Sequence, residues 1–95
     1  MKEQKEQEFE NVWQAWINIG RSAIVEELRT ALNKYPSFNS GHEGYAIIKE
    51  ELDELWEVVK LKQSTPNRNE LMRKEAIQVA AMAIRFLLDL DHFKN

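Results

Sequence analysis

The sequence predicts an all-α fold, a four-helix bundle. Apolar residues recur at helical spacing in four segments of the 95-residue chain, and no segment alternates apolar and polar residues as a strand does. Glycine and proline, five residues in all, are concentrated near the breaks between these segments. A chain of this length forms a single domain, residues 1–95, and we expect so small a core to be completed by oligomerisation.

The first two predicted helices occupy the N-terminal third of the chain. The first spans residues 2–19, with one apolar face, and Gly20 is expected to end it. The second spans residues 22–34 and ends at Tyr35, because a residue that precedes proline avoids the helical region. We therefore divide the domain into an N-terminal amphipathic helix, residues 1–20, and a core, residues 22–92.

The third and fourth predicted helices form a hairpin. Ser40 and Glu43 have the spacing of a capping box, which predicts a helix over residues 41–63. The fourth helix is expected to begin near Pro66 or Asn67 and to run to about Asp91. It is apolar nearly all round between residues 76 and 88, which is typical of the central helix of a bundle.

Composition excludes several classes of protein. The net charge is −3 and no long basic block occurs, which argues against a nucleic-acid partner. The charged first ten residues do not resemble a signal peptide, and the longest apolar stretch is too short to span a bilayer. We therefore expect a cytoplasmic protein with no membrane partner. There is no cysteine and there are only two histidines, so any metal site must be built mainly from oxygen ligands.

Two acidic clusters lie inside apolar sequence on the third and fourth helices. Glu51 and Glu54 are three residues apart, and Glu51 lies only about 60° from the predicted core stripe of its helix. That stripe consists of Ile48, Leu52, Leu55 and Val59. Glu75 and Gln78 repeat the spacing on the fourth helix, and an antiparallel hairpin places the two pairs opposite each other.

Four oxygen ligands facing one cleft favour a hard divalent cation, Mg²⁺ or Mn²⁺. Ionised carboxylates are costly to remove from water unless a positive group meets them. The alternative is that acidic pairs form an ordinary solvated helix surface, and that Glu75 merely complements the dipole near a helix start. This alternative explains Glu50, Asp53 and Glu57 well, but it explains Glu51 and Gln78 poorly because their neighbours are apolar.

Residues 47–55 and 75–83 together resemble the MazG-like, all-α nucleotide pyrophosphohydrolases. That family carries E-E-x-x-E on one helix and E-x-x-D on the next, and the resemblance covers residues 22–90. It is closest to short, single-domain members of phage and bacterial type. The first motif matches fully at Glu50, Glu51 and Glu54, whereas Gln78 stands where the family has aspartate.

The resemblance implies Mg²⁺-dependent hydrolysis of a nucleoside or deoxynucleoside triphosphate to the monophosphate and pyrophosphate, by a homodimer or homotetramer. It implies that Glu51, Glu54, Glu75 and Gln78 are metal ligands. Glu50 would orient or activate the attacking water, so that Glu50 and Glu51 would be the catalytic residues.

Glutamine at position 78 leaves two alternatives open. An amide oxygen can coordinate Mg²⁺ but contributes no charge, so metal binding and hydrolysis are expected to be weaker. The first alternative is a non-catalytic helical module that binds nucleotide or a partner protein. The second is a structural bundle in which the acidic residues pair with Arg85 and nearby lysines.

Four further residues are candidates for binding the substrate. Arg85 is on the face of Gln78 and reaches either a phosphate or the carboxylates of Glu51 and Glu54. Lys60, near the hairpin turn, can guide a triphosphate into the cleft. In the family-like interpretation, Phe38 and His42 lie at the mouth of the site and contact a base, although His42 also fits a solvent-facing position in a capping turn.

Overall fold

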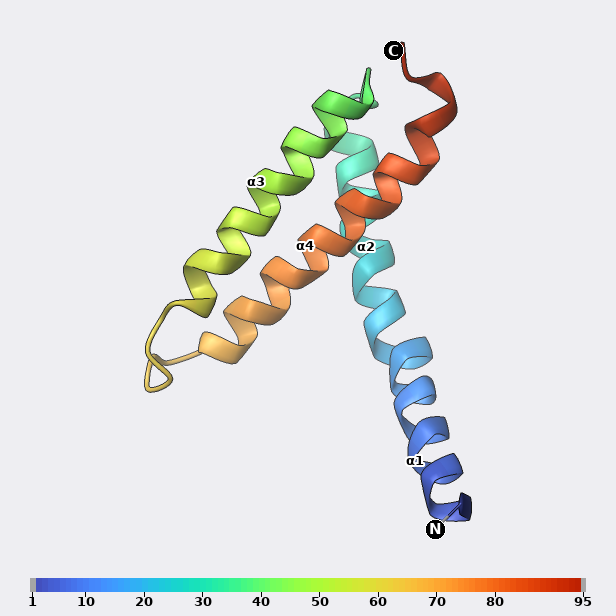
Figure 1. Ribbon diagram of the computed structural model, residues 1–95, viewed down its shortest axis with the longest axis vertical. Helices are drawn as coiled ribbons and strands as arrows, with labels where there is room; N and C mark the ends of the chain where they lie inside the picture. Colours follow the sequence, from blue (N-terminus) through green and yellow to red (C-terminus); the bar gives the residue numbers. More distant parts are fainter. Residues whose placement is uncertain (1, 95) are drawn as a thin grey trace.

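The computed structural model describes residues 2–94, which are all helix, turn or loop (Figure 1). In chain order the elements are α1 (Lys2–Ala15), a π-helical turn (Trp16–Gly20), α2 (Arg21–Lys34), α3 (Gly41–Val59), α4 (Arg68–Asp89) and a 3₁₀ turn (Leu90–His92). The all-α prediction is confirmed. The predicted arrangement of four separate helices is not found.

The predicted helix end at Gly20 is wrong. Gly20 has φ −62° and ψ −47°, which are ordinary right-handed helical values, and the backbone continues through the π-helical turn into α2. Glycine permits the left-handed conformation that ends many helices, but it does not impose it. Residues 2–34 therefore form one long helical rod, and the described chain has three rods in place of four.

The loop between α2 and α3 is close to the prediction. Tyr35 is extended, with φ −125° and ψ 143°, and it ends α2 immediately before Pro36. The Ser40 side chain accepts a hydrogen bond from the Glu43 backbone N–H at 3.0 Å and caps α3. The predicted start of this helix is therefore confirmed.

The turn between α3 and α4 begins earlier than expected. Helix α3 ends at Val59, and Asn67 adopts the left-handed conformation, with φ 63°, directly before α4. The Arg68 guanidinium donates to the Val59 carbonyl at 2.8 Å, which satisfies an acceptor that the helix end would otherwise leave unpaired. Residues 60–67 are thus a closed turn and not a further helical turn of α3.

Helices α3 and α4 lie antiparallel, and α2 packs across α4 (Figure 1). The N-terminal amphipathic helix, α1, extends away from these three (Figure 1). We call residues 2–20 the arm, and α3, the turn and α4 the hairpin. In Figure 1 the molecule has the outline of an inverted V, with the arm as one leg and the hairpin as the other.

The core within one chain is small. Among the described residues, the buried apolar side chains are Ala31, Phe38 and Ala81, and no large side chain is completely buried. Leu52, predicted to be in the core stripe of α3, is 51% exposed. Helices α3 and α4 approach closely at Gly44, because a Cβ added to this glycine would lie only 2.6 Å from Cδ2 of Phe86. None of the described helices is long and apolar enough to cross a membrane.

Candidate metal centre

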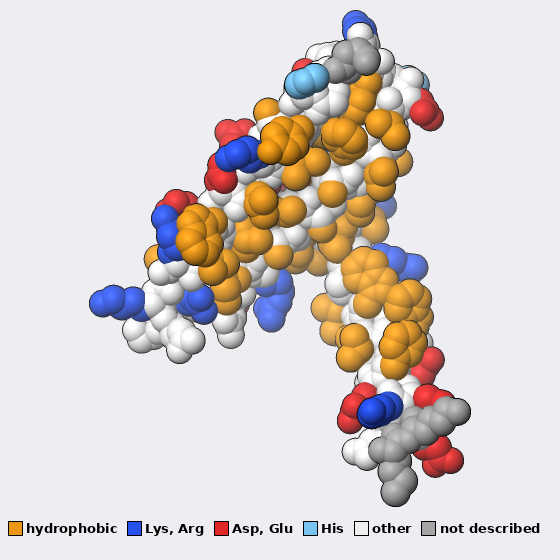
Figure 2. Space-filling view, viewed as in Figure 1, with side chains coloured by type: hydrophobic (Ala, Val, Ile, Leu, Met, Phe, Trp, Pro, Cys, Tyr) orange, Lys and Arg blue, Asp and Glu red, His pale blue; other side chains and the backbone are white. Residues whose placement is uncertain are grey.

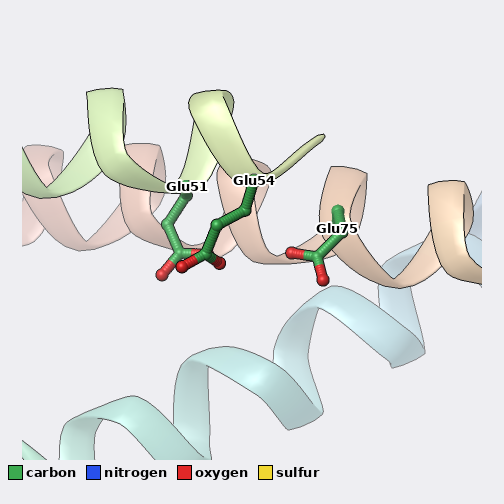
Figure 3. Close-up of side chains that lie close together, drawn as sticks. All are labelled: Glu51, Glu54 and Glu75. Atoms are coloured by element: carbon green, nitrogen blue, oxygen red, sulfur yellow. The ribbon is translucent and has the colours of Figure 1, made fainter. Parts of the chain in front are cut away.

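Three glutamates from the two helices of the hairpin meet on one side of it. Glu51, Glu54 and Glu75 each offer a carboxylate oxygen, and these oxygens lie within 4.8 Å of one another. All three side chains point toward the side on which α2 passes (Figure 3). The helical spacing predicted this convergence, because an antiparallel hairpin places residues at equal distances from its turn opposite each other.

Gln78 joins the same cluster. With its amide nitrogen turned toward the carboxylates, it donates to Oε2 of Glu51 and to Oε2 of Glu75, each at 3.0 Å. Rotation of the amide by half a turn presents its oxygen to the same space. The Gln78 side chain can therefore donate hydrogen bonds to the carboxylates when no cation is bound, and it can offer a neutral oxygen ligand when a cation is bound.

Burial and the neighbouring carboxylates together change the protonation of Glu51. The pKa of Glu51 is raised from 4.5 to about 7, first by partial burial and then by the negative charge of Glu54, a hydrogen bond with Glu54 and the negative charges of Glu75 and Glu50. Within residues 2–94, no lysine or arginine forms an ion pair with Glu51, Glu54 or Glu75. The negative charge at the cluster is therefore not neutralised by the described chain.

The donor set fits a hard divalent cation. Three carboxylates and an amide provide only oxygen ligands from the protein, as Mg²⁺ and Mn²⁺ prefer. The spacing lets one ion contact several of these oxygens, and the uncompensated charge would favour such an ion. Zinc, which favours nitrogen and sulfur ligands, fits this set less well.

A cavity of about 530 Å³ opens beside the cluster, large enough for a small organic ligand. It lies between the hairpin, α2 and the loop that follows α2. Its lining residues are Glu27, Thr30, Ala31, Lys34, Tyr35, Pro36, Phe38, Glu43, Ile47, Glu50, Glu51, Glu54, Gln78, Met82 and Arg85. The acidic cluster thus forms part of one wall of a cavity that also has apolar and aromatic walls.

Several candidates predicted from the sequence lie in this cavity. Glu50 lines it from α3 and is exposed, so its carboxylate is accessible to solvent. Phe38 lines it from the loop, although most of its ring is buried. Lys60 and His42 are exposed and are not among the lining residues. Lys60 pairs instead with Glu57 at 3.0 Å.

Arg85 lines the cavity, but its guanidinium nitrogens donate hydrogen bonds to acceptors within the protein. It is only 3% exposed and donates to Asp89 at 2.9 Å and to the carbonyls of Ala31 and Tyr35 at 3.2 Å each. The pairing with Glu51 or Glu54, one of the two alternatives for Arg85, is not found among the described residues. The guanidinium instead connects α4 to the end of α2, which fixes the wall of the cavity.

Asp89 completes this connection. It accepts a hydrogen bond from the Phe38 backbone N–H at 2.9 Å. Burial alone would raise the pKa of Asp89, but this hydrogen bond, together with those from Arg85 and Ser37, holds it below its usual value. The ionised pair therefore anchors the loop that carries Phe38.

The sequence interpretation missed the contribution of α2. Glu27, Thr30 and Lys34 line the cavity from one face of this helix. Their i, i+3, i+7 spacing places them on one side of α2, next to Ala31, which is buried. A polar row beside a buried alanine was the available indication that this helix borders a site.

No family model, no curated protein and no solved structure matches this chain. Function is therefore inferred from the residues themselves, from their arrangement and from the resemblance of the two helix motifs.

Proposed function

We propose that the protein is a Mg²⁺-dependent nucleoside triphosphate pyrophosphohydrolase, which converts a ribo- or deoxynucleoside triphosphate to the monophosphate and pyrophosphate. One observation carries the proposal. The carboxylate oxygens of Glu51, Glu54 and Glu75 converge within 4.8 Å, and Glu51 and Glu54 also line a cavity of about 530 Å³. The similarity of the two helix motifs to the MazG-like pyrophosphohydrolases supports the same reaction.

The residues have distinct roles in this proposal. Glu51, Glu54, Glu75 and the amide oxygen of Gln78 hold the cation, which neutralises phosphate charge and acidifies nearby water. Glu50 lines the cavity and is exposed, so its carboxylate can accept a proton from an attacking water. The chain has no glycine-rich phosphate loop, so the cation and basic side chains would hold the triphosphate.

Lys34 is the basic side chain best placed for this task. It lines the cavity from the last turn of α2 and is exposed. Arg85, by contrast, can reach a phosphate only by giving up hydrogen bonds that connect α4 to α2. We therefore assign phosphate binding to Lys34 and positioning of the wall to Arg85.

A second candidate is a non-catalytic module that binds nucleotide or a partner protein. Gln78 favours it, because its amide nitrogen can hydrogen-bond both Glu51 and Glu75 and so hold the cluster together without a cation. Hydrolysis would then be absent although the cavity is retained. The cytoplasmic location and the homodimeric or homotetrameric state expected from the sequence also remain predictions.

Product analysis distinguishes the two candidates. The full chain is incubated with a panel of ribo- and deoxynucleoside triphosphates and Mg²⁺ or Mn²⁺, and the products are separated by chromatography. We expect monophosphate and pyrophosphate from the wild type and from Glu57→Gln, an exposed control on the same helix, and neither product from Glu51→Gln. Binding of nucleotide without any turnover, in the wild type and in Gln78→Asp, would reject the enzyme and favour the binding module.

A further inference from the structure

The cavity continues past the candidate metal centre, along the hairpin, toward the loop that follows α2. Acidic groups contribute to its lining, whereas hydrophobic side chains predominate on the face of the hairpin that Figure 2 shows. On α3 it is lined by Glu43, Ile47, Glu50 and Glu54, at the i, i+4, i+7, i+11 spacing of one helix face. Glu43 is eight residues before Glu51, and eight residues of helix span about 12 Å. The cavity therefore has a second end, which a ligand held at the cluster reaches only if it is extended.

The second end of the cavity has an aromatic wall. A Cβ added to Gly44 would lie 3.0 Å from Cδ2 of Phe38, so the Phe38 ring lies beside the first turn of α3, next to Glu43. Cζ of Arg85 lies 5.9 Å from the centre of the same ring, and the Arg85 guanidinium donates to the Tyr35 carbonyl. Phe38 and Tyr35 both line the cavity. A flat, largely apolar surface next to a carboxylate suits a planar ligand group that carries hydrogen-bond donors on its edge.

The Glu43 side chain is held in place by the loop before α3. The amide nitrogen Nδ2 of Asn39 donates to Oε2 of Glu43 at 3.2 Å. The backbone carbonyl of Asn39 accepts from the Lys94 N–H at 2.8 Å, which connects this loop to the C-terminal end of the chain. A carboxylate has about four acceptor positions, so one hydrogen bond leaves it able to accept others from a ligand. Glu43 therefore offers the cavity a positioned group that accepts hydrogen bonds and donates none.

The position of Glu43 along α3 decides which part of a nucleoside triphosphate can reach it. In such a molecule the sugar adjoins the phosphates, and the hydrogen-bonding edge of the base is the part farthest from them. With the phosphates at the cation cluster, a separation of about 12 Å along the helix places Glu43 beside the base edge and beyond the sugar hydroxyls. The plane of the base can then pack against the aromatic wall.

A carboxylate discriminates among the bases by their donors. Guanine presents its N1–H and its 2-amino group side by side, and these can donate to the two oxygens of one carboxylate. Adenine and cytosine each present an amino group beside a ring nitrogen that is itself an acceptor and repels a carboxylate oxygen. Uracil and thymine present one N–H between two carbonyl oxygens. An acceptor of this kind at the base edge therefore favours guanine.

We propose that Glu43 selects guanine, so that the ligand of the cavity is guanosine triphosphate or its deoxy form. The two oxygens of Glu43 accept from N1–H and the 2-amino group, Asn39 keeps the carboxylate oriented, and Phe38 and Tyr35 flank the base. This inference rests on the proposed function in one respect, which is that a nucleoside triphosphate is held through a cation at the cluster. It goes beyond that function by naming the base and the residue that recognises it.

Nucleotide preference tests the proposal. The ratio kcat/KM is measured on the full chain with Mg²⁺ for the triphosphates of guanosine, deoxyguanosine, inosine, adenosine, cytidine and uridine. We expect both guanine nucleotides to exceed the adenosine, cytidine and uridine triphosphates by about tenfold or more, because only guanine forms a bidentate pair with a carboxylate. Inosine triphosphate, which lacks the 2-amino group, should give an intermediate value.

Glu43→Gln is the informative variant, because its amide offers one acceptor and one donor, a pattern that adenine matches and guanine does not. We expect the preference for guanosine over adenosine triphosphate to fall about tenfold or more, with the adenosine value unchanged or raised. Glu70→Gln is the matched control. Like Glu43, Glu70 is the third residue of its helix, but it does not line the cavity, and its replacement should leave the preference within about twofold of the wild type. A merely structural role for Glu43 would lower both values together.

Calorimetry with non-hydrolysable guanosine and adenosine triphosphate analogues separates this proposal from the proposed function. Guanine-selective binding that Glu43→Gln removes, without release of pyrophosphate from any nucleotide, would support the assignment of Glu43 and reject the enzyme. Three results would overturn the assignment of Glu43. These are turnover or binding with no preference for guanine, a preference that Glu43→Gln does not change, and no binding of either analogue.

Discussion

Glu51 is the residue whose titration differs most from that of an ordinary glutamate. Its pKa in the folded chain is about 7, against 4.5 for an unperturbed glutamate. Between these two values the unfolded chain has lost the proton and the folded chain retains it, so the free energy of unfolding falls as the pH rises. Above about pH 7 both states are ionised and the fall ends.

We therefore expect the melting temperature in the absence of divalent cations to decrease from pH 5 to pH 7.5. Glu51→Gln should remove most of this decrease, and Glu57→Gln should preserve it. Saturating Mg²⁺ at pH 7.5 should restore the melting temperature of the wild type, because a cation neutralises the repulsion. A wild-type profile that Glu51→Gln does not alter would contradict the assignment of Glu51 as the strained carboxylate.

Gln78 determines how much negative charge the cluster presents. Gln78→Asp adds a carboxylate where an amide now lies within 3.0 Å of two others. We expect Mg²⁺ affinity, measured by calorimetry, to increase about tenfold, because ligand charge tunes the affinity of oxygen sites. Without a cation the same variant should melt at a lower temperature than the wild type. Lower Mg²⁺ affinity in Gln78→Asp would show that the amide is the better ligand and that this account of the cluster is wrong.

Arg85 and Asp89 form a buried pair, 3% and 5% exposed, that connects three parts of the chain. Arg85→Met would leave the Asp89 carboxylate buried without its cation, at a cost of about 3–5 kcal/mol in the free energy of unfolding. Arg29→Met is the control, since Arg29 pairs with Glu26 at 3.9 Å on the surface, where such pairs contribute less than about 1 kcal/mol. Urea denaturation compares them, and equal losses would contradict a structural role for the buried pair.

At the scale of the elements, two glycines should respond oppositely to alanine. At Gly44 a Cβ would lie 2.6 Å from Cδ2 of Phe86 and 3.0 Å from Cδ2 of Phe38, so Gly44→Ala should cost about 1–3 kcal/mol. Gly20 is helical, and a Cβ added there would lie 2.9 Å from Cε3 of Trp16, whose 39% exposed side chain must move slightly to make room. Gly20→Ala should therefore stabilise the rod by about 0.5–1 kcal/mol. Thermal denaturation measures both, and a gain at Gly44 or a large loss at Gly20 would contradict this account of the packing.

The hairpin and its cluster could be predicted from the sequence because both depend on local regularities. Spacing placed Glu51 with Glu54 and Glu75 with Gln78, and the position of the turn placed the two pairs opposite each other. The capping box predicted the start of α3 because the Ser40 hydroxyl bonds a backbone N–H only three residues away.

Other features depended on interactions that spacing does not encode. Glycine is compatible both with a helix end and with a continuing helix, and at Gly20 the backbone continues as a helix. The role of α2 in the cavity depends on how α2 crosses α4, which its own periodicity does not specify. The stripe containing Leu52 was apolar as predicted, but burial depends on what covers a face, and within one chain nothing described covers Leu52.

At the scale of the whole molecule, the candidate metal centre and the exposed aromatic residues Tyr45 and Trp56 lie on different sides of α3. The cluster points toward α2 (Figure 3), whereas the exposed apolar residues of α3 lie on the far side of the same helix. We expect Val12→Lys to leave the Mg²⁺ affinity of the cluster within about twofold of the wild type, since Val12 is exposed on the arm, which extends away from the hairpin that holds the cluster (Figure 1). Calorimetry on the variant checks this, and a loss of Mg²⁺ affinity of about tenfold or more would show that the arm contributes to the site.

The central claim is that the cluster of Glu51, Glu54, Glu75 and Gln78 is a divalent-cation site for a triphosphate. Electron paramagnetic resonance of Mn²⁺ tests it most directly, because the free ion is counted in the presence of protein and of a non-hydrolysable nucleoside triphosphate analogue. We predict that the wild type and Glu57→Gln bind Mn²⁺ and the analogue together, which lowers the signal of the free ion. Glu51→Gln and Glu75→Gln should bind Mn²⁺ at least about tenfold less tightly. Equal Mn²⁺ binding by all four proteins, or none by any of them, would contradict it.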